Sequence, residues 1–182
     1  MNNVEPIRER TKIVEIKAYL RKNNLRDFLL FVLGINSGLR ISDLLCLKIE
    51  DVMNKDRIIL KEKKTGKTKD FPISKNCKNA INDYLLQSMR KSGWLFVSRR
   101  GNNPISRIQA YRIINRAARQ VGITEAIGTH TLRKTFGYWA YKTGTDVTRI
   151  QKLLNHSSPE ITLAYIGITK DELDDVYINL NL

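Results

Sequence analysis

Apolar residues recur at helical spacing along most of the chain, and one central region departs from that spacing. Residues 9–22 place Ile13, Ile16 and Leu20 on one face, which predicts an amphipathic helix. Residues 25–37 are nearly all apolar, which is typical of a helix buried on every side. These two segments predict that the first part of the chain is helical.

Two glycines lie within and directly after the second helical segment. Gly34 lies inside the apolar segment and indicates close packing, while Gly38 marks the end of the helix because glycine tolerates the left-handed conformation. A short helix is expected over the next residues, 41–46.

The central region has the pattern of short strands. Val52, residues 58–60 and residues 71–73 are β-prone runs separated by charged turns, and Gly66 lies at the expected tip of a hairpin. We therefore predict a small antiparallel sheet of three strands over about residues 47–73.

Helical spacing returns after the sheet and continues to the end of the chain. Ser106 is a favourable N-cap for a helix that ends near residue 122. Further helices are predicted over residues 76–90, 130–143, 146–154, 159–165 and 170–180. The predicted fold class is α+β, predominantly helical, with one small sheet.

The composition points to a globular chain in a reducing compartment. The chain has 182 residues, 42% of them hydrophobic, which suffices for one domain with a core. Its longest apolar run, Phe28–Leu33, is far shorter than a membrane span, and polar residues fill the N-terminus. Cys46 and Cys77 form no disulfide framework or zinc motif. We expect a cytoplasmic location.

The charge of the chain favours a polyanionic partner. Its net charge is +14, and residues 84–124 contain no Asp or Glu. A second basic stretch covers residues 61–69, and a solvated surface stays open as the simpler explanation for both. The basic residues that we single out as candidate DNA contacts are Lys61, Lys63, Lys67, Arg99, Arg100, Arg107, Arg112 and Arg116.

The two histidines of the chain lie near residues suited to phosphate chemistry. His130 and Arg133 are three residues apart and share one helix face, and Tyr165 follows His156 by nine residues. Cleavage of a phosphodiester without a metal needs fixed positive charge, a nucleophile and proton transfer. Arginine binds phosphate oxygens in pairs, tyrosine can form a phosphoester, and histidine transfers protons near neutral pH.

At these residues the chain resembles the tyrosine recombinases, the lambda-type integrases and their Xer-like relatives. The arginine motif of that family matches Ser37–Asp43, with Arg40 in its centre, and the hairpin lysine matches Lys64. The His-x-x-Arg box matches His130–Arg133 and the Leu-Leu-x-His box matches Leu153–His156. The nucleophile of the family falls at Tyr165, and order and spacing agree over residues 4–180.

The resemblance implies a site-specific DNA recombinase that forms a 3′-phosphotyrosyl intermediate without ATP, cofactor or metal. Arg40 and Arg133 would bind the scissile phosphate, and Lys64 would protonate the leaving 5′ oxygen. His130 would handle the proton of Tyr165. The resemblance further implies that His156 contacts a phosphate oxygen and that Asp43 orients an active-site arginine or histidine.

Several assignments stay open at the level of sequence. Lys61, Lys63, Lys67 and Lys69 compete with Lys64, and Tyr138, Tyr141 and Tyr177 compete with Tyr165. Two other functions share these residues: a type IB-like topoisomerase, and a DNA-binding regulator that keeps the fold without cutting.

The same resemblance sets the expected domain organisation and partners. Residues 1–182 are expected to form a single catalytic domain, with the N-terminal core-binding domain of the family absent. Double-stranded DNA and further copies of the chain are the expected partners. An apolar stripe in the last helix is expected to pack either in cis or on a neighbouring protomer, and it consists of Leu173, Val176, Tyr177 and Leu180.

Overall fold

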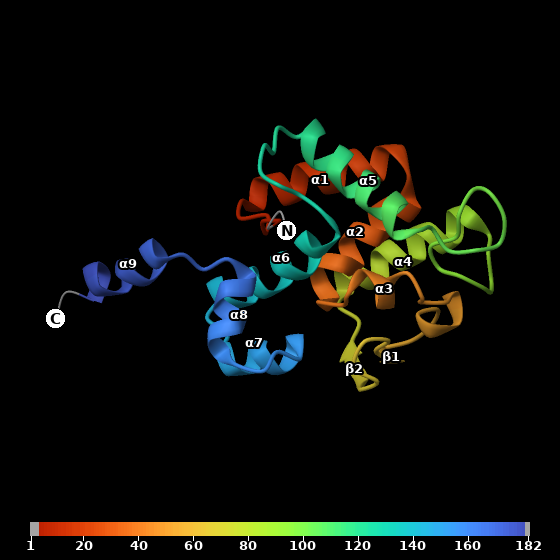
Figure 1. The fold of residues 1–182 in the computed structure, drawn as a ribbon. Helices are drawn as coiled ribbons and strands as arrows, with labels where there is room; N and C mark the ends of the chain where they lie inside the picture. Colours follow the sequence, from red (N-terminus) through yellow and green to blue (C-terminus); the bar gives the residue numbers. More distant parts are fainter. Residues whose placement is uncertain (1–3, 181–182) are drawn as a thin grey trace.

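The computed structural model describes residues 4–180 of the chain (Figure 1). The predicted helices are present, with ends that lie within a few residues of those expected from the sequence. The elements in chain order are α1 (Arg10–Asn23), α2 (Leu25–Ser37), α3 (Ile41–Leu44), the 3-10 helix η1 (Ile49–Asp51), β1 (Arg57–Lys61), β2 (Thr68–Pro72), α4 (Lys75–Ser88), α5 (Arg107–Gln120), α6 (Thr129–Lys142), α7 (Val147–Leu154), α8 (Pro159–Ile166) and α9 (Lys170–Leu180).

Helix α2 is the centre of the main hydrophobic core. It packs against α1, α4 and α6, and its residues from Phe28 to Gly34 are all buried. A Cβ built on Gly34 would lie 2.4 Å from Cδ1 of Leu132 in α6. Gly34 thus permits the close contact between α2 and α6, the helix that carries His130 and Arg133.

The sheet has two strands in the described residues, not the three that the sequence pattern predicts. β1 pairs with β2 in antiparallel register, with Ile58 opposite Phe71. The region around Val52 forms η1 instead, because the backbone N–H of Lys48 donates to the Asp51 carboxylate at 2.7 Å. Val52 is buried by packing next to this turn rather than by strand pairing.

A second, smaller core lies under α6, α7 and α8. Tyr138, Ile150, Leu154 and Ile166 are its buried residues. A Cβ on Gly137 would lie 2.5 Å from Cγ2 of Ile166, so α6 and α8 approach closely there. This contact fixes the helix that carries Tyr165 against the helix that carries His130.

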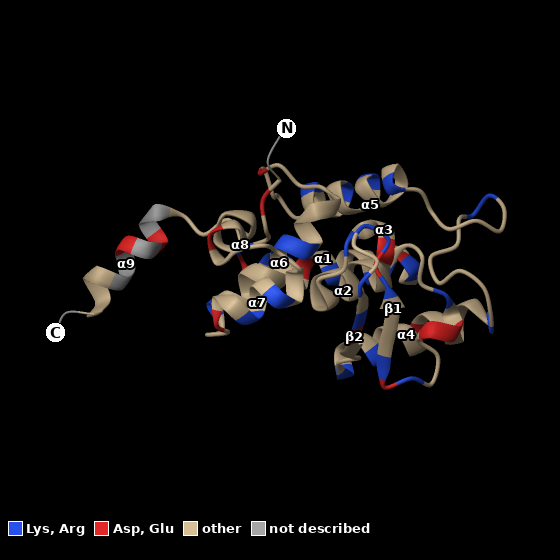
Figure 2. Cartoon of the chain, turned by 60° about the horizontal axis from the view of Figure 1, so that its bottom comes forward, with Lys and Arg blue, Asp and Glu red and all other residues tan. Residues whose placement is uncertain are grey.

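Charged side chains are unevenly distributed over the elements. Lys and Arg lie on the β1–β2 hairpin, on α5 and on the loop before α5, whereas α9 carries acidic residues (Figure 2). Helix α9 projects away from the other helices (Figure 1). Within residues 4–180, no helix is both long and apolar enough to cross a membrane.

Candidate active site

The six residues predicted to act on DNA line one cavity of about 330 Å³. Four different parts of the chain supply it: the start of α3, the hairpin turn, α6, and the α7–α8 segment. Its lining residues are Arg40, Lys64, His130, Arg133, Asn155, His156, Ser157, Ile161 and Tyr165. Among residues 4–180, no group of three or more His, Cys, Asp and Glu side chains is arranged to hold a metal ion.

Gly38 places Arg40 at the edge of this cavity. It ends α2 in the left-handed conformation with φ of 59°, and a Cβ there would lie 2.6 Å from the ring of Phe136. The chain then turns so that Arg40 becomes the N-cap of α3, with its side chain only 17% exposed. A residue other than glycine would face both backbone strain and a clash at this turn.

Arg133 is buried and connects two parts of the backbone. Its Nη1 donates to the carbonyl oxygen of Gly38 at 2.5 Å, and its Nη2 donates to the carbonyl oxygen of Leu154. Burial lowers the pKa of Arg133, and the charge of Arg40 acts in the same direction. Arg133 therefore holds the end of α2 and the end of α7 on either side of the cavity.

His130 and Tyr165 are in direct contact. Nδ1 of His130 lies 3.3 Å from the hydroxyl of Tyr165, which donates the proton when the imidazole carries its own proton on Nε2. The pKa of His130 is lowered, first by burial and then by the charges of Arg107 and Arg133. The imidazole is thus neutral at pH 7 and suited to accept a proton from the tyrosine.

Opposing effects act on the acidity of Tyr165. Burial raises the pKa of its hydroxyl, while the charges of Arg133 and Arg40 act to lower it. Burial is the larger effect, so the free protein holds Tyr165 protonated. A group that removes the proton during attack is consequently needed, and His130 is in contact with the hydroxyl.

His156 packs against the ring of Tyr165. The two rings are edge-on at 73° with centroids 4.8 Å apart, and Nδ1 of His156 lies 3.2 Å from the hydroxyl oxygen of Thr162. Burial and the charges of Arg133 and Arg40 lower the pKa of His156 to about 4. His156 is neutral near pH 7, so it can donate one hydrogen bond to a phosphate oxygen without adding charge.

The hairpin presents Lys64 at the cavity and is tied to the core through Asp43. The backbone N–H of Lys63 donates to Oδ1 of buried Asp43 at 2.9 Å. Lys64 itself is exposed and lines the cavity. Asp43 therefore orients the hairpin backbone through this hydrogen bond, whereas the family resemblance implies a role toward an arginine or histidine.

Lys69 occupies a different position from the other hairpin lysines. Its Nζ donates to the carbonyl oxygens of Ser37 and Leu153, both at 3.2 Å. Burial and the charge of Arg133 lower its pKa to about 8. Lys69 thus supports the backbone behind the cavity and does not line it, in contrast to Lys64.

Two site residues were missed at the level of sequence. Glu62 is buried at the base of the hairpin turn, and its Oε2 lies 3.0 Å from Nη1 of Arg40. Asn155, in the left-handed conformation after α7, donates to the same oxygen at 2.8 Å. The signal for Glu62 is that it is the only acid within the basic stretch 61–69.

The basic residues predicted to contact DNA lie in separate regions of the structure. Lys61, Lys63 and Lys67 are exposed on the hairpin. Arg107 at the start of α5 is exposed and close enough to His130 to lower its pKa. A separate groove of about 550 Å³ lies between α5 and the α1–α2 corner, and it contains the remaining four: Arg99, Arg100, Arg112 and Arg116.

Comparison with known proteins shows the family to which the chain belongs. Residues 8–172 match the phage integrase family, and the chain belongs to that family, whose members include the tyrosine recombinases. The chain is 50% identical over 177 residues to the probable integrase/recombinase YoeC of Bacillus subtilis (strain 168), covering 97% of each chain.

More distant relatives are longer than this chain. It is 33% identical over 159 residues to the tyrosine recombinase XerD of Corynebacterium glutamicum, covering 85% of this chain but 52% of that protein. The crystal structure of XerA recombinase superposes with a TM-score of 0.80 at 22% identity, over 98% of this chain and 64% of that one. This likeness shows a shared fold, and the chain spans about half the length of the XerD relative.

Proposed function

We propose that this protein carries out site-specific DNA recombination by cleaving and rejoining strands through a 3′-phosphotyrosyl intermediate. In this proposal residues 1–182 act as one catalytic domain on double-stranded DNA. Membership of the phage integrase family and the names of the relatives support it. The observation that carries it is the contact of Tyr165 with His130 inside a cavity that Arg40 and Arg133 also line.

Cleavage begins with phosphate binding in this scheme. Arg40 and Arg133 contact the non-bridging oxygens, where each charge-assisted hydrogen bond contributes roughly 1.5–3 kcal/mol. His156 donates a further hydrogen bond to a phosphate oxygen. The added positive field of the arginines also stabilises the negative charge that develops in the transition state.

Bond exchange then follows at phosphorus. The hydroxyl oxygen of Tyr165 attacks as its proton passes to His130, and the bond to the 5′ oxygen breaks as that oxygen takes a proton from Lys64. The products are a 3′-phosphotyrosyl linkage and a free 5′ hydroxyl. Attack by a 5′ hydroxyl from another strand reverses these steps and completes strand exchange, without an external energy source.

A covalent adduct assay tests this proposal. The protein is incubated with a pool of nicked duplexes, randomised around the nick, whose short 5′-hydroxyl leaving strand diffuses away after cleavage. Wild-type protein is expected to form a denaturation-resistant protein–DNA adduct, and Tyr165→Phe none. Tyr177→Phe, at an exposed residue of α9, is the matched control and should retain the adduct. An adduct with Tyr165→Phe would show that another residue is the nucleophile.

The adduct assay separates the alternative functions when it is combined with a gel shift and a relaxation assay. A protein that shifts DNA on a gel yet forms no adduct would be a non-cutting DNA-binding regulator. Relaxation of supercoiled DNA without sequence preference would indicate a type IB-like topoisomerase. Recovery of one preferred sequence from the adduct pool, followed by joining to a second duplex, would support recombination.

We further propose that DNA contacts extend from the cavity along the hairpin and α5. Lys61, Lys63 and Lys67 are exposed beside Lys64, and Arg107 is near His130. Arg112 and Arg116 face the other groove. Charge reversal at Arg107 is therefore expected to weaken DNA binding more than the same change at Arg116, and a salt titration of the affinity measures the difference.

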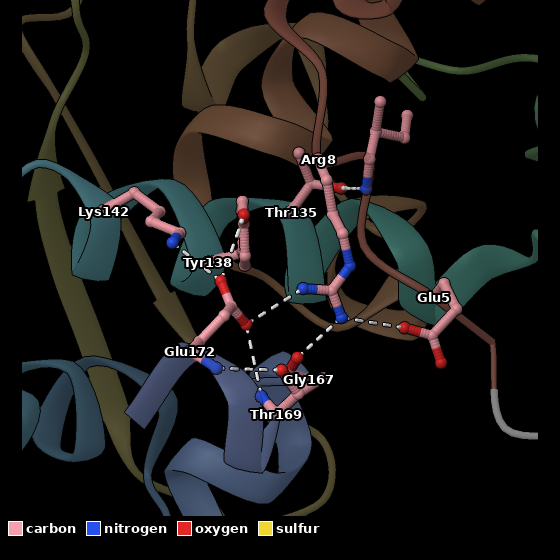
Figure 3. Close-up of polar contacts among 9 residues, drawn as sticks. Glu5, Arg8, Thr135, Tyr138, Lys142, Gly167, Thr169 and Glu172 are labelled. Atoms are coloured by element: carbon pink, nitrogen blue, oxygen red, sulfur yellow. Dashed lines mark hydrogen bonds and ion pairs between the residues drawn. The ribbon is translucent and has the colours of Figure 1, made fainter. Parts of the chain in front are cut away.

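The last helix is proposed to contact a second protomer on DNA. Tyr177 and Leu180 are exposed, at 82% and 60%, whereas the side chains of Leu173 and Val176 lie outside the described residues. The base of α9 is fixed in cis: Glu172 pairs with Arg8 at 3.2 Å and with Lys142 at 2.7 Å (Figure 3). An anchored base with an exposed apolar end favours packing in trans over packing in cis.

A further inference from the structure

Glu62 is a buried carboxylate at the meeting point of three segments that carry site residues. Its side chain is shielded from solvent, at 1% exposure for the residue. Oε2 accepts from the Thr65 hydroxyl at 2.7 Å and from the Asn155 amide at 2.8 Å. Nη1 of Arg40 lies 3.0 Å from the same oxygen. One carboxylate oxygen thus contacts the hairpin turn, the end of α7 and the start of α3.

The charge of Glu62 is maintained by these contacts. Burial alone would raise its pKa, but the hydrogen bond from Thr65 and the charge of Arg40 outweigh it, and the pKa is lowered. A buried carboxylate without such partners would be strongly destabilising. Together these contacts favour the ionised form of Glu62 inside the protein.

Each partner of Glu62 is a site residue or the neighbour of one. Arg40 lines the cavity directly, Thr65 follows Lys64, and Asn155 precedes His156. The backbone of Glu62 also closes the hairpin turn, because its carbonyl oxygen accepts from the N–H of Gly66 at 2.8 Å. Movement of Glu62 would therefore shift a phosphate-binding arginine, the leaving-group lysine and a histidine at once.

We propose that Glu62 is a positioning residue of the cleavage reaction, which orients Arg40 toward the scissile phosphate and fixes the segments that carry Lys64 and His156. The inference rests on the proposed function. Glu62 does not line the cavity, so it acts through its partners and not on DNA. The negative charge of Glu62 lies next to a phosphate-binding residue and does not itself attract DNA. Its contribution to the reaction therefore lies in geometry and not in DNA affinity.

Glu62→Gln tests this role, because the amide keeps the size of the side chain and removes its charge. At saturating DNA we expect adduct formation to slow by about tenfold or more, since small misplacements of catalytic groups cost one to two orders of magnitude. The dissociation constant for DNA should change by no more than about twofold and in the direction of tighter binding, because a negative charge is lost.

Asp70→Asn is the matched control on the same hairpin. Asp70 pairs with Arg57 at 2.7 Å, and both side chains are about half exposed, so its neutralisation removes a charge from a residue that does not line the cavity. Adduct formation and DNA affinity should stay within about twofold of wild type, as expected for an exposed ion pair. Equal slowing in Glu62→Gln and Asp70→Asn, or no slowing in Glu62→Gln, would overturn the inference.

DNA with a neutral methylphosphonate at the scissile position distinguishes positioning of Arg40 from a general loss of structure. Less negative charge develops at phosphorus in the transition state of this substrate. Its cleavage rate should therefore depend less on the orientation of Arg40. The rate ratio of wild type to Glu62→Gln should therefore shrink on this substrate. A general structural defect would give the same ratio on both DNAs, and that outcome contradicts the proposal.

Failure of the proposed function can be told apart from failure of this inference. Wild-type protein that forms no adduct would count against recombination by this chain. The contact itself is then tested by melting temperatures of Glu62→Gln, Asn155→Ala and the double variant. We expect the double variant to lose less than the sum of the two single shifts. Additive shifts would overturn the coupling on which the role of Glu62 depends.

Discussion

The imidazole of His156 lies edge-on to the ring of Tyr165, with centroids 4.8 Å apart, and is held neutral there by burial and by two arginines. Because the folded protein lowers the pKa of His156 to about 4 from 6.5, the unfolded chain binds this proton more readily. The stability that results is present above about pH 6.5 and is lost as the pH falls toward 4.

Replacement of His156 should make the melting temperature depend less on pH below neutrality. His156→Gln retains a polar partner for Thr162 and has no proton to gain, so its melting temperature should fall less than that of wild type between pH 7 and pH 4. His130 contributes in the same direction but is present in both proteins. Melting curves measured at half-unit pH steps check this, and parallel pH profiles would refute it.

Lys64 and Lys69 can be distinguished by the chemistry of the leaving group. Lys64→Ala should slow cleavage strongly on normal DNA, because the 5′ oxygen departs poorly without a proton. A duplex with sulfur in place of that oxygen should restore the rate, since a thiolate leaves without protonation. Lys69→Ala should show no such rescue, because Lys69 contacts backbone carbonyls. Rescue of Lys69→Ala alone would move the acid role to Lys69.

Gly38→Ala should destabilise the protein more than Gly144→Ala. Both glycines have positive φ, at 59° and 86°, so an alanine at either one incurs roughly 1–2 kcal/mol of backbone strain. Only at Gly38 would the new Cβ also meet the ring of Phe136. Urea unfolding should show a larger loss for Gly38→Ala, together with slower adduct formation because Arg40 is displaced. Equal losses would argue against the clash.

Glu172→Gln should loosen α9 with little effect on the rest of the protein. Its pairs with Arg8 and Lys142 are partly exposed, so global unfolding should change by about 1 kcal/mol or less. Hydrogen exchange of residues 170–180 should become faster, and exposed Asp174→Asn on the same helix serves as the control. Unchanged exchange in Glu172→Gln would show that other contacts hold the helix.

Long helices were the part of the fold that the sequence determined most directly. The apolar spacing of α1 and α2 predicts their ends to within one residue, because each buries one continuous face or its whole surface. For the segment around Val52, the same reasoning predicted a strand, and this prediction was wrong. Its apolar residues are buried, but whether they pair in a sheet depends on the Asp51 carboxylate that closes a turn at Lys48.

Site residues that belong to sequence motifs could be predicted. Site residues whose role depends on contacts between distant parts of the chain could not. The spacing of His130, Arg133 and Tyr165 indicated the set of residues that the structure brings into one cavity. Glu62 could not be found in this way, since its burial depends on residues 40 and 155, far away in the sequence. The separation of Arg107 from Arg116 likewise depends on which side of α5 faces α6.

Arg133 enters any encounter with DNA already fixed in place. Its two terminal nitrogens donate to the carbonyl oxygens of Gly38 and Leu154, so folding has already removed most of its rotamer freedom. A flexible surface arginine would lose that freedom on binding and give up part of its affinity. Preorganisation of this kind also disfavours phosphates that approach in a different orientation. The backbone carbonyl groups that hold Arg133 therefore contribute to selectivity for DNA geometry.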